Sequence, residues 1–168
     1  QQVAYDKDGN WGKSGSVHDK LLEVMWRDSF FKSSPPKSTG REHFNLSWLQ
    51  DLLDYFSKSP IAAEDVQATL TELTAVAIID AVKTYASETN RLLVCGGGVN
   101  NLYLMQRLTQ LAGDVRVEST ASLDYQPQWI EAAAFAYLAK LTLDNQPGNL
   151  PSVTGASQQV ILGGIYPS

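Results

Sequence analysis

Three consecutive glycines, at positions 96–98, follow directly on the apolar segment 92–95 and constrain the fold more than any other feature of the sequence. Four apolar residues in a row are typical of a strand that is buried on both faces. The glycines end regular structure, and Asn100 or Asn101 can cap a helix that begins after them. The segment therefore predicts a strand, a glycine turn and a helix N-terminus in succession.

A turn without side chains lets a ligand lie against the main chain itself. The glycines at 96–98 have no Cβ, and the unpaired N–H groups at the start of the next helix favour a phosphate or the polar edge of a nucleotide. A tight strand-to-helix turn that binds nothing fits the same residues, although three glycines exceed what such a turn requires. The turn is therefore a candidate nucleotide site.

Two stricter nucleotide-binding motifs do not fit this turn. The Rossmann pattern G-x-G-x-x-G requires glycine at the position of Asn101, although Glu118 lies about where the ribose-binding acid would be expected. A Walker A loop requires Gly-Lys-Ser or Gly-Lys-Thr at its end, and no such tripeptide follows the glycines. A P-loop is therefore not the phosphate-binding element here.

Composition excludes several classes of protein. The net charge is −5 and the pI is near 4.9, whereas a protein that coats nucleic acid needs clustered Lys and Arg. No apolar run approaches the ~20 residues that a membrane-spanning helix needs, and the N-terminus has no signal-peptide pattern. Cys95, the single cysteine, excludes a disulfide framework, and its place in the apolar segment predicts a buried, inert thiol.

A calcium site is also excluded. Asp6, Asp8 and Asn10 have the spacing of calcium ligands, but the glycine and the final glutamate of an EF-hand loop are missing, so no metal ligand is assigned.

Helices and strands alternate along the chain, which predicts an α/β domain over residues 1–168. Apolar periodicity predicts helices at 16–27, 46–56, 64–86, 101–112 and 127–143, and strands at 92–95, 115–118 and 160–166. Ser16 with Asp19 resembles a capping box at the start of the first helix, and Asn45 is the expected cap of the second. A right-handed crossover makes the first two strands parallel neighbours, with the long helix 64–86 packed under them. Residues 5–15, 32–42 and 144–157 read as loops. The first suits a surface loop or an active-site rim, the second an anion, a sugar or a solvated linker, and the third a lid or binding loop. Because the chain begins without methionine, we interpret it as part of a longer protein.

One carboxylate stands out in the last helix. Glu131 shares a face with Ala134, Phe135 and Leu138 at helical spacing. Burial of this charge costs several kcal/mol unless donors or a cation meet it, and the helix N-terminus returns only about 0.5 to 1 kcal/mol. A self-capping glutamate is the alternative, but a capping residue gains nothing from apolar neighbours. We therefore favour a role in which Glu131 faces a ligand.

Five segments, in the same order as here, resemble the anhydro-N-acetylmuramic acid kinase family. They are residues 5–9, 36–42, 95–101, 131–139 and 148–155, with the sequences Tyr-Asp-Lys-Asp-Gly, Pro-Lys-Ser-Thr-Gly-Arg-Glu, Cys-Gly-Gly-Gly-Val-Asn-Asn, Glu-Ala-Ala-Ala-Phe-Ala-Tyr-Leu-Ala and Gly-Asn-Leu-Pro-Ser-Val-Thr-Gly. The resemblance covers essentially the whole chain. It corresponds to the C-terminal half of those enzymes.

The resemblance implies a fold and an activity. The fold is the C-terminal domain of the actin-like ATPase (ribonuclease H-like) class, a short parallel sheet with packed helices, in a two-domain sugar kinase whose N-terminal domain is absent from this chain. With ATP and Mg²⁺, such an enzyme opens 1,6-anhydro-N-acetylmuramic acid with water and phosphorylates O6, giving N-acetylmuramic acid 6-phosphate in cytoplasmic cell-wall recycling. The partners implied are ATP, the anhydro amino sugar and, in the full-length protein, a second copy; nucleic acid and membrane are not among them.

The resemblance also assigns roles to residues. It places the adenosine end of ATP at Gly96, Gly97, Gly98 and Asn100, and it places Glu131 near the sugar and the attacking water as a supporting catalytic residue. The family's catalytic aspartate lies in an Asp-Thr-Gly-Pro-Gly-Asn region upstream of this sequence, so the chain alone is expected to be inactive. The alternatives are a non-catalytic nucleotide-binding module of the same superfamily and a Rossmann oxidoreductase, which Asn101 disfavours.

Overall fold

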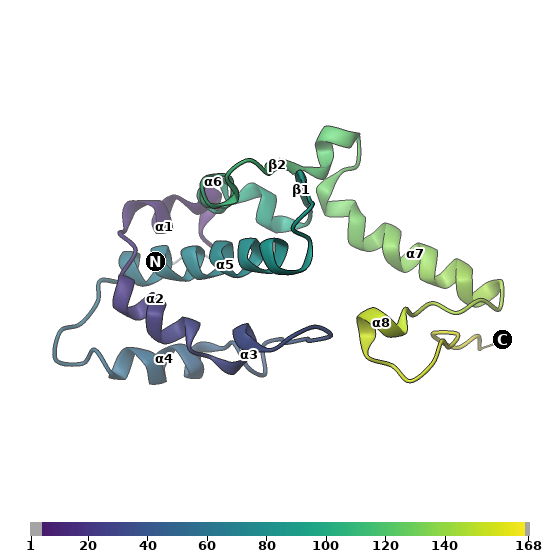
Figure 1. The fold of residues 1–168 in the computed structure, drawn as a ribbon, viewed down its shortest axis with the longest axis horizontal. Coiled ribbons are helices and arrows are strands. Elements are labelled where there is room, and N and C mark those ends of the chain that lie inside the picture. The colour runs from purple at the N-terminus through teal and green to yellow at the C-terminus, as the bar shows by residue number, and fades with distance from the viewer. Residues whose placement is uncertain (1–4, 167–168) are drawn as a thin grey trace.

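The long helix α5 (Ala63–Tyr85) forms the axis of the molecule in the computed structural model, which describes residues 5–166. Glu64 and Asp65 in its first turn and Lys83 in its last turn complement the helix dipole. Figure 1 shows α5 between two layers, with α6 and the strands on one side and α2 and α4 on the other. The long helix that the sequence predicts at 64–86 is confirmed, as is its position against the sheet.

The first layer consists of α2 (Asp19–Trp26), α3 (Ser29–Lys32) and α4 (Leu46–Asp54). Leu21 and Met25 of α2 pack against Val66 and Leu73 of α5 to form one core cluster, surrounded by partly buried aromatic side chains of α3 and α4. Asn45 caps α4 by accepting a hydrogen bond from the Trp48 amide at 3.0 Å. This confirms the cap that the sequence predicts.

The start of α2 differs from the prediction. A capping box at Ser16 was expected, but the helix begins at Asp19 and the ring of His18 accepts the hydrogen bond from the Leu21 amide at 3.1 Å. Ser16 is held elsewhere, because its amide donates to Asp65 Oδ1 of α5 at 2.7 Å. A carboxylate from another helix therefore determines the path of the chain before α2.

The second layer is a two-stranded parallel sheet with its crossover helix. Strands β1 (Arg91–Val94) and β2 (Arg116–Ser119) are joined through the short turn η2 (Gly97–Asn100) and α6 (Leu102–Ala112), and Leu92 pairs with Val117. Ala75 and Ile79 of α5 form the second core cluster with the inner side of α6, and Leu92 packs against it. The α/β class and the parallel pairing are confirmed.

Residues 5–15 are not the surface loop that their glycines and charges predict. They form η1 (Lys7–Gly9) and α1 (Asn10–Ser14), which pack on α5 and α6. Asp6 caps α1, since its carboxylate accepts from the amides of Trp11 and Gly12, both at 2.9 Å. Gly12 is buried against α5, where a Cβ would lie 3.3 Å from Thr71 Oγ1. Packing against α5 and α6 thus makes this segment helical, although its own residues have little preference for a helix.

The C-terminal part extends away from these layers (Figure 1). It comprises η3 (Thr120–Leu123), η4 (Pro127–Trp129), α7 (Ile130–Leu143) and α8 (Pro151–Thr154). The segment 144–157 is therefore not purely a loop, because α8 lies within it.

The prediction of a strand at 160–166 is wrong. Within the part of the chain that the structure describes, no neighbouring strand pairs with it, and a positive φ of 85° at Gly163 bends it. Among residues 5–166, no helix combines the length and apolar character needed to cross a bilayer.

Candidate functional site

The glycine turn is open to a ligand. Gly96 has φ 75° and ψ −167°, a conformation that is available essentially to glycine alone. A Cβ built on Gly96 or Gly97 would meet no atom within 4 Å, and one on Gly98 would meet only the Leu104 side chain, at 3.8 Å. No side chain therefore fills the space above the turn, and Gly96 is required by its backbone angles rather than by crowding.

The main-chain amides of the turn are not equivalent. The Gly96 N–H donates to the carbonyl oxygen of Pro127 at 2.9 Å, which joins the turn to η4 at the start of α7. Gly97 and Gly98 begin η2, and the first amides of a helical turn precede its hydrogen-bonded ladder. A ligand on this turn would consequently meet the amides of Gly97 and Gly98, whereas Gly96 shapes the turn and anchors it.

A cavity of about 550 Å³ lies next to the turn. Gly97, Asn100 and Asn101 line one side, and the segment Tyr5 to Asp8 lines the other. Two of the four predicted nucleotide-binding residues, Gly97 and Asn100, therefore share one cavity, together with a segment about ninety positions away in sequence. The sequence predicts a surface loop or an active-site rim at residues 5–15, but it does not predict that residues 5–8 lie opposite the glycine turn.

The two walls of this cavity are locked together. Gly9 has φ 71°, and a Cβ there would lie 2.0 Å from Asn101 Oδ1 and 2.9 Å from the Tyr103 Cβ. The same Asn101 oxygen accepts from the Leu104 amide at 2.9 Å and so caps α6. Only glycine at position 9 lets η1 approach the α6 cap this closely, which fixes the width of the cavity.

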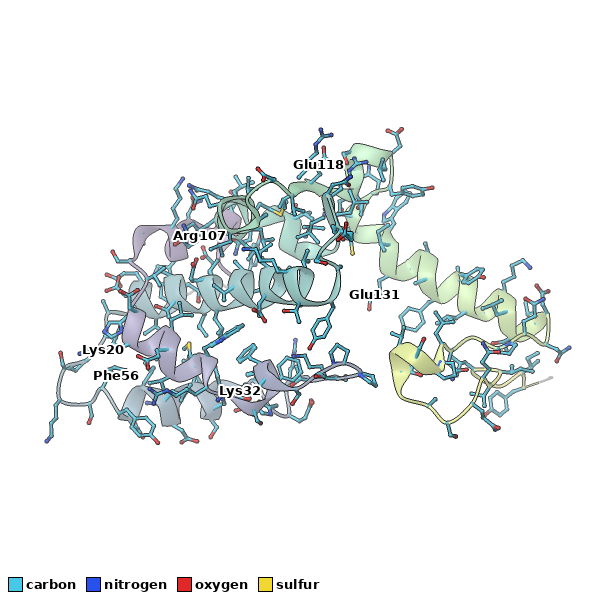
Figure 2. The ribbon with its side chains drawn as sticks, viewed as in Figure 1. Lys20, Lys32, Phe56, Arg107, Glu118 and Glu131 are labelled. Atoms are coloured by element: carbon cyan, nitrogen blue, oxygen red, sulfur yellow. The ribbon has the colours of Figure 1, made fainter. Side chains whose placement is uncertain are left out.

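Glu131 lies in the first turn of α7, away from this cavity (Figure 2). Its side chain is exposed, and α7 contains no buried residue within the described structure. The expectation that Glu131 is a carboxylate buried among apolar neighbours is therefore wrong for this chain, because no element covers those neighbours. Pro127 connects the start of α7, where Glu131 lies, to the glycine turn. The Pro127 carbonyl accepts the hydrogen bond from the Gly96 amide, and η4 lies directly before α7.

Cys95 is exposed, not buried as predicted. Strand β1 ends at Val94, so Cys95 already belongs to the turn that leaves the sheet. Four apolar residues in sequence suggested a strand one residue longer than the one that forms. The error is a strand boundary, the least reliable part of a prediction from periodicity.

Glu118, the residue in the position of a Rossmann ribose-binding acid, is engaged within the sheet. Arg91 Nε donates to Glu118 Oε2 at 2.5 Å, and Arg91 Nη2 donates to Ser122 Oγ at 3.0 Å. Figure 2 shows Glu118 near the top of the sheet and on a different element from Glu131. This pairing further disfavours a dinucleotide-binding role for Glu118.

A buried ion pair fixes the helix that follows the turn. Arg107 of α6 donates to Glu72 of α5 through Nε at 2.5 Å and Nη2 at 2.8 Å, and Glu72 is only 5% exposed. The hydrogen bonds to Glu72 raise the pKa of Arg107 above its ordinary value. Figure 2 shows Arg107 directed toward α5. The sequence signal was weak, because Glu72 is one of several charged and polar residues of α5 and its partner is distant in sequence.

The polar loop 32–42 is anchored at its base. Asp28 Oδ2 accepts from His43 Nε2 at 2.8 Å and from Trp48 Nε1 at 3.1 Å. Burial raises the pKa of Asp28, but hydrogen bonds from His43, the Phe30 amide and Trp48 outweigh it and hold the pKa below its ordinary value. Lys37 donates to the Phe30 carbonyl at 2.8 Å, so this lysine of the loop is already engaged.

Comparison with known proteins agrees with the five segments noted in the sequence. The sequence model of the anhydro-N-acetylmuramic acid kinase family matches residues 1–168. The chain belongs to the anhydro-N-acetylmuramic acid kinase family. It is 50% identical over 165 residues to the anhydro-N-acetylmuramic acid kinase of Pseudomonas syringae pv. syringae, covering 98% of this chain and 45% of that protein. The Coxiella burnetii kinase is 45% identical over 162 residues, which cover 96% of this chain and 43% of that protein.

Membership of the anhydro-N-acetylmuramic acid kinase family confirms the resemblance on which the functional interpretation depends. The chain spans less than half the length of these curated relatives. In residues 5–166, no three His, Cys, Asp or Glu side chains are arranged to hold a metal ion.

Proposed function

We propose that this chain is one domain of a two-domain kinase with an actin-like fold. In this proposal the complete enzyme uses ATP and Mg²⁺ to open 1,6-anhydro-N-acetylmuramic acid with water and to phosphorylate O6. Its product is N-acetylmuramic acid 6-phosphate, and the reaction serves cell-wall recycling in the cytoplasm of the organism. The complete enzyme works as a homodimer. Family membership supports the proposal, and the open glycine turn beside a cavity is the observation that gives this domain its part in it.

The residues of the turn fit the adenosine end of ATP. A side chain at position 97 would project into free space next to the cavity, so glycine keeps that space available. The amides of Gly97 and Gly98 supply donors, and the side chain of Asn100 offers both a donor and an acceptor to a purine edge. Gly96 contributes the backbone angles that direct the turn.

In our proposal, phosphoryl transfer itself takes place outside this domain. ATP with Mg²⁺ supplies the γ-phosphoryl group when bound, and transfers of this type depend on positioning and on neutralising charge. The base that activates water is the family's aspartate, which this chain does not include. A domain that positions only one end of the nucleotide should not turn over, so the 168-residue chain alone is expected to be inactive.

Glu131 is the residue through which this domain touches the sugar in our proposal. Its carboxylate lies in the first turn of α7. An ionised carboxylate accepts hydrogen bonds only, so Glu131 can orient a water molecule or a sugar hydroxyl by accepting from it. The link between Gly96 and Pro127 fixes the start of α7 relative to the glycine turn.

The experiment that tests the proposal uses the full-length kinase that contains this chain. Isothermal titration should detect binding of ATP and of the anhydro sugar and none of NAD, and mixing both ligands should give the 6-phosphate. Gly97→Val places a branched side chain next to the cavity, so the KM for ATP should rise at least about tenfold. Ser87→Val, at an exposed position before β1, is the matched control and should leave that KM unchanged.

Two results would contradict the proposal. Binding of ATP without any phosphorylation of the sugar would favour the alternative, a non-catalytic nucleotide-binding module of the same superfamily. An unchanged KM for ATP in Gly97→Val, with normal turnover, would mean that the nucleotide does not lie on the glycine turn.

A further inference from the structure

The cavity beside the glycine turn has two walls of different chemistry. Gly97 and Asn100 lie on one wall, which offers main-chain amides and an amide side chain, and residues 5–8 form the other, which is charged. The cavity volume of about 550 Å³ is within the range of sites that hold small ligands. Because η1 and η2 contact each other, the two walls belong to one packed unit. The charged wall therefore decides what a ligand on the glycine turn meets on its other side.

Two carboxylates belong to the charged wall, but only one of them is available to a ligand. The Asp6 carboxylate accepts from the amides of Trp11 and Gly12, both at 2.9 Å, and so is used as the cap of α1. Among residues 5–166, no hydrogen bond or ion pair engages the carboxylate of Asp8, which is partly exposed and lines the cavity. Asp8 therefore has free hydrogen-bonding capacity on this wall.

The backbone holds Asp8 at the cavity. Asp8 has φ 57° and ψ 10°, and Gly9 after it has φ 71°. Two successive left-handed residues turn the chain sharply, and aspartate is among the few residues with a side chain that tolerate this conformation. The close approach of Gly9 to Asn101 fixes this turn against the α6 cap. The position of Asp8 thus depends on the same contact that sets the width of the cavity.

The hydrogen-bond donors of a nucleotide decide which part of it can meet Asp8. An ionised carboxylate accepts hydrogen bonds only, and it repels phosphate oxygens. ATP has its donors at the ribose hydroxyls and at the amino group of adenine. Asn100, on the opposite wall, already offers a donor and an acceptor to the purine edge in the proposed function. The ribose hydroxyls are therefore the donors left for Asp8.

Carboxylates bind ribose in this way in dinucleotide sites, where an acidic side chain accepts from the 2′ hydroxyl. In this chain Glu118 has the sequence position of such an acid, but it is paired with Arg91 at 2.5 Å. Lys7, which also lines the cavity, is a cation and suits a phosphate, so it does not compete for a hydroxyl donor. Asp8 is consequently the residue of this cavity that fits the ribose.

We propose that Asp8 selects ribonucleotides by accepting a hydrogen bond from the 2′ hydroxyl of ATP. The inference rests on the proposed function, because it requires a nucleotide on the glycine turn, and it makes Asp8 a specificity-determining residue of that site. Hydrogen bonds to charged groups are stronger than those between neutral groups, and loss of the hydroxyl leaves the carboxylate without its partner. The complete kinase should therefore prefer ATP to 2′-deoxyATP by at least about tenfold in kcat/KM.

Exchange of Asp8 for glycine tests the proposal in the full-length kinase that contains this chain. Asp8→Gly removes the carboxylate and adopts the left-handed backbone without strain, so the variant should fold. Its kcat/KM for ATP should fall at least about tenfold, whereas its kcat/KM for 2′-deoxyATP should stay within about threefold. Asp124→Gly is the matched control and should keep the preference for ATP, because Asp124 is an exposed aspartate with φ 63° outside the cavity.

Three results would overturn the proposal. One is equal use of ATP and 2′-deoxyATP by the unsubstituted kinase, and another is a full preference for ATP in Asp8→Gly. The third is an Asp8→Gly kinase that still discriminates against 2′-deoxyATP but no longer against inosine triphosphate, which lacks the adenine amino group; Asp8 would then face the base.

A second variant decides if Asp8→Gly fails to fold. Asp8→Asn keeps the shape of the side chain and tolerates the left-handed backbone, but it has no charge. It should reduce the preference for ATP over 2′-deoxyATP by at least about threefold. An unchanged preference in Asp8→Asn would overturn the proposal.

The same measurements distinguish this inference from the proposed function. Phosphorylation of the sugar with an unchanged ribose preference in Asp8→Gly would end the inference and leave the proposed function in place. Binding of ATP without phosphorylation would end the proposed function. Isothermal titration with ATP and 2′-deoxyATP would then give the ribose preference as a ratio of Kd values, to which the same criteria apply.

Discussion

Helices α5 and α7 are both rich in apolar residues, but their surroundings differ completely. Helix α5 buries Leu73, Ala75 and Ile79 between two layers of the molecule, whereas α7 buries no residue within the described structure. The contrast extends to their carboxylates, because Glu72 of α5 is paired and enclosed while Glu131 of α7 is exposed. Composition alone therefore does not determine burial; the number of neighbouring elements does.

This difference indicates that α5 and α7 have different roles in the domain. Polar groups enclosed in α5 have partners in this chain, as when Thr69 accepts from the His18 amide at 2.9 Å and Glu72 binds Arg107. The Glu72 to Arg107 pair holds α6, the helix that follows the glycine turn, against α5. The groups of α7 have few neighbours here, which is expected of a helix that meets its ligands and packing partners in the complete enzyme. The predictions below test this division.

The largest effect is expected from Glu131→Gln in the full-length kinase. Glutamine keeps the shape of the side chain but loses the charge that, in our proposal, orients water, so turnover should fall by about two to four orders of magnitude. The KM for ATP should change by less than about threefold, because in our proposal the nucleotide lies on the glycine turn and not at Glu131. Steady-state kinetics with the anhydro sugar measure both values. Asp144→Asn, at the other end of α7, is the control, and a normal rate for Glu131→Gln would remove this residue from the mechanism.

Breaking the buried pair of α5 should give the next largest effect. Glu72→Ala leaves the Arg107 guanidinium without its partner and should lower the free energy of unfolding by about 3 to 5 kcal/mol. The double variant Glu72→Leu with Arg107→Met should recover most of this loss, because neither charge remains. Urea unfolding measures both.

The exposed pair of α7 provides the comparison for this experiment. Lys140 and Asp144 are an i, i+4 pair whose side chains are 68% and 42% exposed. Asp144→Asn should change the free energy of unfolding by less than about 0.5 kcal/mol. Equal losses for Glu72→Ala and Asp144→Asn would mean that α5 and α7 do not differ in the way their burial indicates.

Alanine substitutions at two glycines with positive φ distinguish the stability cost of steric crowding from that of backbone strain. Gly155→Ala introduces a side chain at φ 73° and ψ 9°, the left-handed conformation that Gly9 also has, and its Cβ would approach only the Pro36 side chain, at 3.3 Å, so the variant should lose about 1 kcal/mol of unfolding free energy. Gly9→Ala adds a collision with Asn101 and should cost at least about 2 kcal/mol. Urea unfolding of the two variants side by side gives the difference. If the two losses are the same, η1 and the α6 cap are not held as closely as their packing indicates.

Elements with strong local signals could be predicted from sequence. The periodicity of α5 and the cap residues Asn45 and Asn101 gave the positions of three helices, and the crossover rule gave the parallel pairing of β1 and β2. Each of these depends on residues close together in the chain or on a chirality that all proteins share. The glycine turn was predictable for the same reason.

Features that depend on distant residues could not be predicted. Residues 5–8 opposite the glycine turn, the Glu72 to Arg107 pair and the contact of Gly9 with Asn101 each join segments far apart in sequence, for which periodicity gives no signal. The burial of Glu131 was wrong for a related reason. An apolar stripe predicts that a helix face will be covered, but it does not say by which part of the polypeptide.

The smallest expected effect concerns Asp28 and the pH dependence of stability. Folding lowers the pKa of Asp28 below its value in the unfolded chain, which is about 3.9 for aspartate. The ionised carboxylate therefore stabilises the folded protein at pH values above the unfolded pKa. This stabilisation is lost as the pH falls through the lower pKa of the folded state. Asp28→Asn removes it, together with the charge that holds His43 and Trp48 at the base of loop 32–42. The variant should therefore be less stable than the natural protein at neutral pH, and the gap should narrow below about pH 4. Urea unfolding midpoints of both proteins at neutral pH and below about pH 4 measure this difference in stability. Asp51→Asn, at an exposed position on α4, is the control. A gap of the same size at both values would show that the hydrogen-bond geometry of Asp28, and not its charge, anchors the loop.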